Sequence, residues 1–112
     1  MYNARTSSGN NKRSNQYIAN DILAANPVEL IMKVYDFAIV NSKKNNMLKT
    51  NQALQALVNA LNFEHPDARE LSASLLKIYL YCQDQMRKQK NENVTRILTE
   101  LRDTWRTALQ KR

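Results

Sequence analysis

The sequence is poor in the residues that interrupt helices and in those that cross-link chains. Its 112 residues include one Gly, two Pro and one Cys. β-Branched residues are scattered and never alternate over the length of a strand, so the composition favours an all-α fold. A single Cys excludes an internal disulfide, which is typical of a reducing compartment. No apolar run approaches the roughly 18 residues of a membrane span, and residues 1–16 lack a signal-peptide core, so we expect a cytoplasmic protein.

The sequence also lacks the side-chain combinations of common catalytic and metal sites. Its one His, His65, stands before Pro in a predicted turn, where a solvent-facing polar residue is ordinary. It has no Glu-x-x-His pair or Cys/His set for a metal and no glycine-rich loop for a phosphate. Cys82 falls on an apolar helical stripe, and we interpret it as a small buried hydrophobic residue. We therefore expect no enzymatic activity, no metal and no cofactor.

Positive charge is in excess, with 17 basic and 10 acidic residues and a net charge of +7. Such a balance indicates an acidic partner, a nucleic acid or a membrane surface, or it serves solubility alone. Nucleic acid is not the expected partner, because no basic block reaches five residues and no aromatic residues interleave with the basic ones. The short basic clusters are Lys12–Arg13, Lys43–Lys44, Arg87 to Lys90, and Lys111–Arg112.

Hydrophobic periodicity predicts an antiparallel four-helix bundle with a short N-terminal helical cap segment. Residues 1–14 have almost nothing to bury and are expected to be a disordered tail, followed by a single domain over residues 15–112. The first helix has a strong start signal, with Asn26 as the cap, Pro27 at the first position and Glu29 for a capping box. The predicted helices run from Asn26 to about Asn41–Lys44, and over Met47–Asn62, Asp67–Lys88 and Asn93–Gln110.

Each predicted helix has a core stripe. We expect Tyr35, Leu75, Tyr79 and Trp105 to be structural core residues. The stripes are Ile31, Val34, Tyr35 and Ala38; Leu54, Leu57, Val58 and Leu61; Leu71, Leu75, Ile78, Cys82 and Met86 with Tyr79 beside them; and Val94, Ile97, Leu98, Leu101, Trp105, Ala108 and Leu109.

The first and third predicted helices have more apolar surface than one seam needs. Leu76 and Leu80 lie far round the third helix from its core stripe, and alanines form a second stripe on the helix before it. Helix propensity alone would also explain the alanines. Contiguous exposed apolar surface usually marks an interaction site, and a groove for an amphipathic helix is the expected form. The predicted partner-binding residues are Ala53, Ala56, Ala60, Ala73, Leu76, Leu80 and Tyr81.

A short apolar segment precedes the first predicted helix. Its residues Tyr17, Ile18, Ile22 and Leu23 recur at helical spacing, and Pro27 separates them from that helix. The segment is too short to be helical by itself and has to dock. It is interpreted either as an ordinary N-terminal core helix or as a displaceable cap over an apolar groove.

Four groups of residues follow one another in order along residues 17–109. The groups are Tyr17, Asn20, Ile22, Ala24, Pro27, Leu30 and Val34–Ile39; Leu57, Leu61, Asn62 and Phe63; Leu75, Tyr79, Tyr81 and Cys82; and Leu101–Trp105. Together these groups resemble the flagellin-specific flagellar export chaperones. The sequence departs from that pattern at Val34, Phe37 and Leu80, where the family has Leu, Gly and Asp, and both helical hairpins are shorter.

The resemblance implies a cytoplasmic chaperone that binds the C-terminal region of flagellin, prevents its premature polymerisation and keeps it competent for flagellar type III secretion. It also implies that the N-terminal segment occupies client-binding surface in the empty chaperone. The sequence leaves open which flagellin is bound, and whether the export apparatus, an anti-sigma factor or a co-chaperone is a further partner. The alternatives are a homodimeric helical-bundle interaction protein with another client and, less favoured, a basic nucleic-acid-binding protein.

Overall fold

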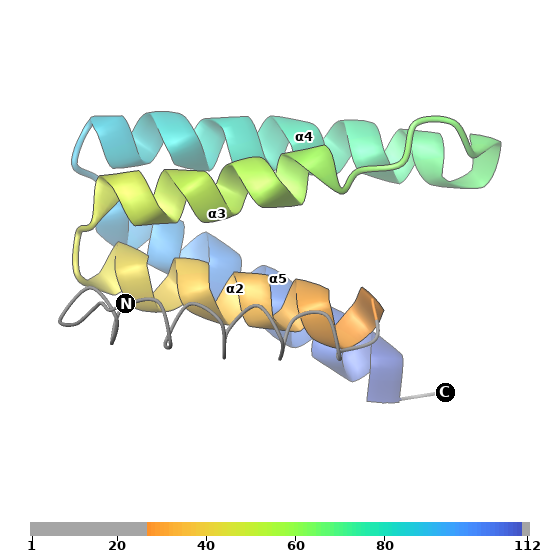
Figure 1. Ribbon diagram of the computed structural model, residues 1–112, viewed down its shortest axis with the longest axis horizontal. Coiled ribbons are helices and arrows are strands. Elements are labelled where there is room, and N and C mark those ends of the chain that lie inside the picture. The colour runs from red at the N-terminus through yellow and green to blue at the C-terminus, as the bar shows by residue number, and fades with distance from the viewer. Residues whose placement is uncertain (1–26, 111–112) are drawn as a thin grey trace, which may run out of the picture. The chain divides into compact units, whose positions relative to one another are not determined.

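The computed structural model describes residues 27–110, which fold into four α-helices without a strand (Figure 1). The all-α prediction is therefore confirmed. The predicted cap segment and the capping residue Asn26 lie outside the described residues. The packing between helices described below lies within residues 31–110. The helices are α2 (Pro27–Lys43), α3 (Met47–Asn59), α4 (Pro66–Arg87) and α5 (Asn91–Gln110).

The first and last connections are tight turns of the same design. The N–H of Asn46 donates to the Asn41 carbonyl at 2.9 Å, and the N–H of Lys90 donates to the Gln85 carbonyl at 2.9 Å. These six-to-one bonds close each helix end after a residue in the left-handed region, Asn45 with φ of 55° and Gln89 with φ of 61°. The chain thus makes two sharp reversals without glycine.

Helix α3 ends at Asn59, three residues before the predicted end at Asn62. The Asn62 side-chain oxygen accepts hydrogen bonds from the backbone N–H groups of Glu64 at 3.0 Å and His65 at 3.2 Å. An asparagine that bonds to nearby backbone N–H groups offers the chain an alternative to helix, so the helix stops early. Helix α4 begins at Pro66, one residue before the predicted start at Asp67, and α5 begins at Asn91, two residues before the predicted start at Asn93.

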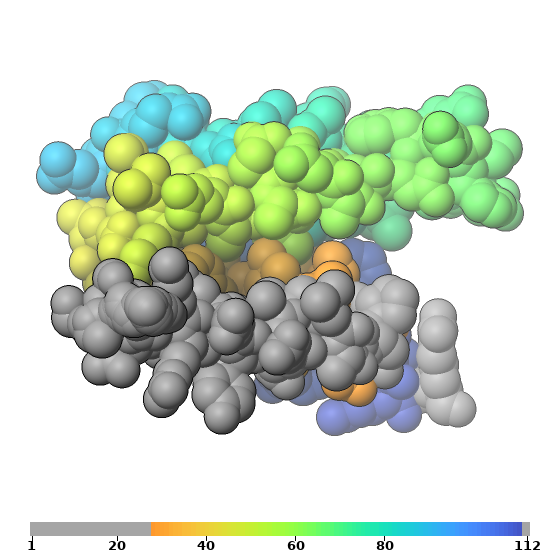
Figure 2. Space-filling view, in the orientation of Figure 1, coloured from red at the N-terminus to blue at the C-terminus, as the bar shows by residue number. Residues whose placement is uncertain are grey.

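All four helices contribute to the hydrophobic core. The predicted core residues Tyr35, Leu75 and Tyr79 are buried, and Trp105 is partly buried and packs against them. Helix α3 packs along α4, and α4 packs along α5; Figure 2 shows the first of these pairs, with α3 in yellow-green beside α4 in cyan. The buried core residues are Tyr35, Ala38, Ile39, Ala53, Leu54, Leu57, Leu75, Tyr79, Cys82, Met86, Val94 and Leu98.

Three placements from the helical periodicity are wrong. Ala108, predicted to be in the core stripe of α5, is exposed. Leu71, predicted to be in the core stripe of α4, is 51 % exposed, because the first turns of α4 project beyond the shorter α3 (Figure 1). Ala53, predicted to lie on an outer surface of α3, is 6 % exposed and belongs to the core. Ala53 stands four residues before Leu57, so the two side chains share one helical face.

Candidate binding groove between α4 and α5

Three aromatic side chains from distant parts of the chain meet in the core. The hydroxyl oxygens of Tyr35 and Tyr79 lie 2.6 Å apart, and Trp105 Nε1 donates to the Tyr35 hydroxyl at 3.2 Å. The two tyrosine rings pack edge to face, with centroids 6.4 Å apart. Burial raises the pKa of both tyrosines, so both hydroxyls stay neutral. This cluster joins α2, α4 and α5 by hydrogen bonds within the core.

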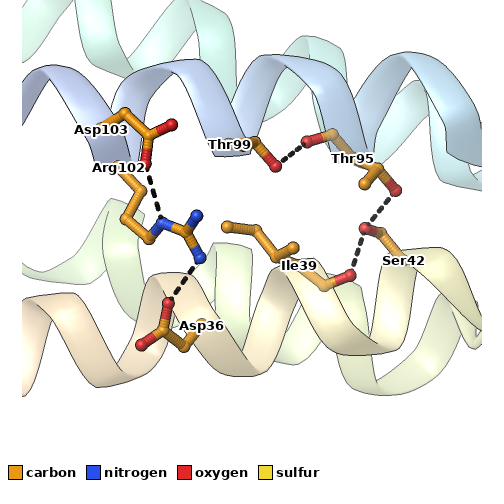
Figure 3. A network of polar contacts seen from close by, with 7 residues as sticks. All are labelled: Asp36, Ile39, Ser42, Thr95, Thr99, Arg102 and Asp103. Atoms are coloured by element: carbon orange, nitrogen blue, oxygen red, sulfur yellow. Dashed lines mark hydrogen bonds and ion pairs between the residues drawn. The ribbon is translucent and has the colours of Figure 1, made fainter.

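Polar contacts continue along the α2–α5 seam (Figure 3). The Ser42 and Thr95 hydroxyl oxygens lie 2.6 Å apart. Further along, Arg102 donates to Asp36 at 2.9 Å and to Asp103 at 3.2 Å. The hydrogen bond to Asp36 is the main reason that the pKa of Arg102 is raised. Directional contacts therefore hold α5 against α2 at several points along their length.

The other side of α5 forms an open apolar groove with α4. The groove has a volume of about 540 Å³. Tyr81 is 50 % exposed, while Ile78, Ile97 and Leu101 are partly buried beside the core. The two walls also carry opposite charges, Lys77 on α4 and Glu100 on α5. The groove is lined by Lys77, Ile78, Tyr81, Ile97, Glu100, Leu101 and Thr104.

The predicted partner-binding leucines lie on the opposite flank of α4. Leu76, Leu80 and Gln83 share one stripe at helical spacing. The Gln83 side chain donates to the Asn51 carbonyl at 3.2 Å and to the Gln55 side chain at 3.3 Å, which identifies this flank as the one that faces α3. Leu80 is 48 % exposed there and Leu76 is partly buried.

The exposed alanines of α3 do not share a groove with these leucines. Gln55 contacts α4, and Ala56 lies about 100° further round the helix, on the side away from α4. Ala60 follows Ala56 by four residues and shares its face. The seven predicted partner-binding residues are therefore divided among separate places. Ala53 is in the core, Ala56 and Ala60 lie on one side of α3, Ala73, Leu76 and Leu80 lie on the outer and α3-facing parts of α4, and Tyr81 lines the α4–α5 groove.

Most of the groove was not predicted from the sequence. Ile78, Ile97 and Leu101 were assigned to core stripes, and they do pack against the core with part of their surface. Lys77 and Glu100 were assigned no role, because their polar character is ordinary for an outer helix face. Helical spacing gives the angle of a side chain but not how closely the neighbouring helix approaches it. The groove therefore has no signal in the sequence beyond the breadth of the apolar surface of α4.

Residues 27–110 have neither a metal-binding group of side chains nor a reactive thiol. No three or more His, Cys, Asp and Glu side chains of this region are grouped so that they could hold a metal ion. Cys82 is fully buried, as predicted, and burial raises the pKa of its thiol to about 12, so at neutral pH it is not a thiolate nucleophile. Among the same residues, no helix is both long and apolar enough to span a membrane.

The apolar N-terminal segment is not part of this geometry. The predicted cap residues Tyr17, Ile18, Ile22 and Leu23 lie outside the described residues. The candidate binding surface that the described residues offer is therefore the α4–α5 groove.

Comparison with known proteins adds no relative. The chain matches no protein-family model, no curated protein and no solved structure. The function therefore has to be argued from the residues and contacts of this chain.

Proposed function

We propose that this protein is an export chaperone that binds the C-terminal region of flagellin as a helix in the α4–α5 groove. Bound in this way, the client segment is withheld from polymerisation and kept available for flagellar type III secretion. The activity is binding alone, and no catalytic step or cofactor is involved.

The observation that carries the proposal is that residues of three separate family-like groups contact one another. Tyr35 comes from the first group, Tyr79 from the third and Trp105 from the fourth, and their polar atoms meet in one hydrogen-bonded cluster. Asp36 and Arg102, again from the first and fourth groups, form an ion pair at 2.9 Å. The residues that carry the resemblance therefore form one connected structural unit, which supports the proposal.

The groove supports the helical form of the client. An amphipathic helix buries apolar side chains spaced three and four residues apart in such a groove. Tyr81 supplies a large and partly exposed aromatic surface, and aromatic residues dominate the energetics of many interfaces. Lys77 and Glu100 on opposite walls favour one orientation of a client helix that has charges on both edges.

The affinity should be moderate for the area buried. The C-terminal region of flagellin is proposed to be disordered before binding, so part of the interaction free energy is spent on ordering it. A moderate affinity also suits a chaperone that has to release its client.

The test is a calorimetric titration of the full chain with a flagellin C-terminal peptide. A peptide of the same composition in scrambled order is the control. We expect saturable binding of the native peptide only, with a gain of helical circular dichroism on binding. A tight dimer in sedimentation that ignores the peptide would instead favour the homodimeric interaction protein. Salt-sensitive binding of duplex DNA without peptide binding would favour the nucleic-acid-binding alternative.

A further inference from the structure

The fold brings together two basic clusters that are separate in the sequence. The α2–α3 turn and the α4–α5 turn lie at the same end of the helices, shown as yellow and blue segments in Figures 1 and 2. The Asn91 side chain, at the start of α5, donates to the Ser42 carbonyl, near the end of α2, at 2.8 Å and ties the two turns together. Both turns close through a residue in the left-handed region and a six-to-one hydrogen bond, so their positions are well defined.

This end of the helices holds the whole positive excess of the described residues. Six exposed basic side chains stand in the two turns and the adjoining helix ends, with two acidic side chains, Asp84 and Glu92, which gives a net charge of +4. The remaining described residues carry six basic and seven acidic side chains, a net charge of −1. Asp84 is already engaged with Lys88 at 3.0 Å. The basic end consists of Lys43, Lys44, Lys49, Arg87, Lys88 and Lys90.

Two apolar side chains stand exposed within the basic end. Leu48 is 64 % exposed, and Met47 beside it is 42 % exposed. Both belong to the first turn of α3, between the lysine pair Lys43–Lys44 and Lys49. Leu48 and Met47 therefore present apolar surface to solvent among the lysines.

We propose that the basic end binds an anionic phospholipid surface, with its lysines in the headgroup region and Leu48 and Met47 inserted at the acyl boundary. Clusters of four to eight basic residues are attracted to such surfaces. An apolar side chain that is buried at the boundary between headgroups and acyl chains strengthens the binding further. The bound protein lies on the membrane and does not cross it.

The shape and composition of the basic end favour a lipid surface over other anionic partners. It is built from helix ends and short turns, and the α4–α5 groove does not extend to it. A peptide would need a groove, and duplex DNA is usually read by a helix face placed in the major groove. Residues 43–49 and 87–92 contain no aromatic side chain on which a single-stranded base would stack. Five of the six cations are lysines, which act as point charges without the forked geometry that arginine uses for a particular phosphate.

The test is flotation of the full chain with vesicles. Vesicles of equal parts phosphatidylcholine and phosphatidylglycerol should bind the protein, vesicles of phosphatidylcholine alone should not, and added salt should weaken the binding. Each lysine near an anionic surface contributes about fivefold in partitioning, so the triple variant Lys43→Gln, Lys44→Gln, Lys49→Gln should lose about 100-fold. Equal binding to both kinds of vesicle, or to neither, would overturn the proposal.

A matched triple variant separates the basic end from net charge. Arg69→Gln, Arg96→Gln and Arg106→Gln remove the same charge from elsewhere on the described helices and should leave vesicle binding unchanged. Both triple variants keep the same N-terminal and C-terminal basic residues, so any contribution of those residues to vesicle binding is equal in the two. An equal loss in the two triple variants would contradict a role of the basic end.

Leu48→Gln tests the insertion step. The change leaves the charge as it is and should lower partitioning about fivefold through the loss of apolar burial. If the variant partitions as the wild type does, and duplex DNA binds as tightly as the vesicles, the basic end is a nucleic-acid surface instead. Flagellin-peptide binding should be unchanged in the lysine and leucine variants, because none of these residues lines the α4–α5 groove. The membrane proposal thus stands or falls separately from the chaperone proposal.

Discussion

The two sides of α5 make contrasting contacts. Towards α2, the helix is held by the Ser42–Thr95, Asp36–Arg102 and Tyr35–Trp105 hydrogen bonds. Towards α4, its Ile97 and Leu101 form part of an open groove whose lining is mainly apolar. Hydrogen bonds are directional and costly to leave unmade, so they fix position, whereas apolar contacts tolerate a change of partner. We conclude that α5 is anchored on one side and leaves apolar surface open on the other.

Tyr35→Ala tests the anchored side and should have the largest effect. The change removes a fully buried ring and leaves the Tyr79 hydroxyl and Trp105 Nε1 without their partner, which should cost about 3–5 kcal/mol of unfolding free energy. Phe37→Ala removes an aromatic ring two residues away that is 46 % exposed, and should cost about 1 kcal/mol or less. Urea denaturation of both variants would measure the difference. Similar losses would mean that the aromatic cluster is not the anchor.

High pH should destabilise the fold, because it ionises the buried Cys82 thiol and the buried Tyr35 and Tyr79 hydroxyls. The Cys82 pKa rises from 9.0 to about 12 on folding, so above pH 9 the unfolded chain binds fewer protons than the folded chain. The free energy of unfolding should therefore keep its full value below pH 9. Between pH 9 and 12, ionisation of this thiol should lower it by about 1.4 kcal/mol per pH unit. Tyr35 and Tyr79, whose pKa values are also raised, add to the loss above pH 10.

The control for the pH effect is Cys82→Ala. This variant should have a lower free energy of unfolding than the wild type at neutral pH. Between pH 9 and 12, however, its free energy of unfolding should fall less steeply, because it has no thiol to titrate at position 82. Denaturation curves at several pH values for both proteins give the two slopes. Equal slopes would contradict the burial of a protonated thiol in the folded state.

Asp36→Asn should have a small effect on the anchored side. The ion pair with Arg102 joins side chains that are 50 % and 22 % exposed, so its loss should cost about 0.5–1 kcal/mol. The difference from the wild type should shrink in high salt, because salt screens the pair. Glu100→Gln, which breaks the more exposed 3.7 Å pair with Arg96, should cost less. A larger loss in Glu100→Gln would mean that the α2–α5 ion pair has no special role.

The fold was largely predictable from the sequence, and the groove was not. Helical periodicity identified four helices and the burial of Tyr35, Tyr79 and Cys82, because a core residue has to recur on one helix face. The same periodicity does not determine how far a neighbouring helix extends, which is why Leu71 is exposed. It also does not determine which flank of a broad apolar helix stays uncovered, so Tyr81 and Leu80 were both predicted to bind the partner although they lie on different sides of α4.

Those two adjacent residues provide the most direct test of the central claim. Tyr81 is 50 % exposed in the α4–α5 groove, and Leu80 is 48 % exposed on the flank that faces α3. Asp at either position should change the unfolding free energy little, because both side chains are half exposed. In a titration with the flagellin C-terminal peptide, Tyr81→Asp should weaken binding by about 30-fold or more, as expected for a central aromatic contact. Leu80→Asp should bind as the wild type does. The reverse pattern, with binding lost in Leu80→Asp and kept in Tyr81→Asp, would contradict the assignment of the client to the α4–α5 groove.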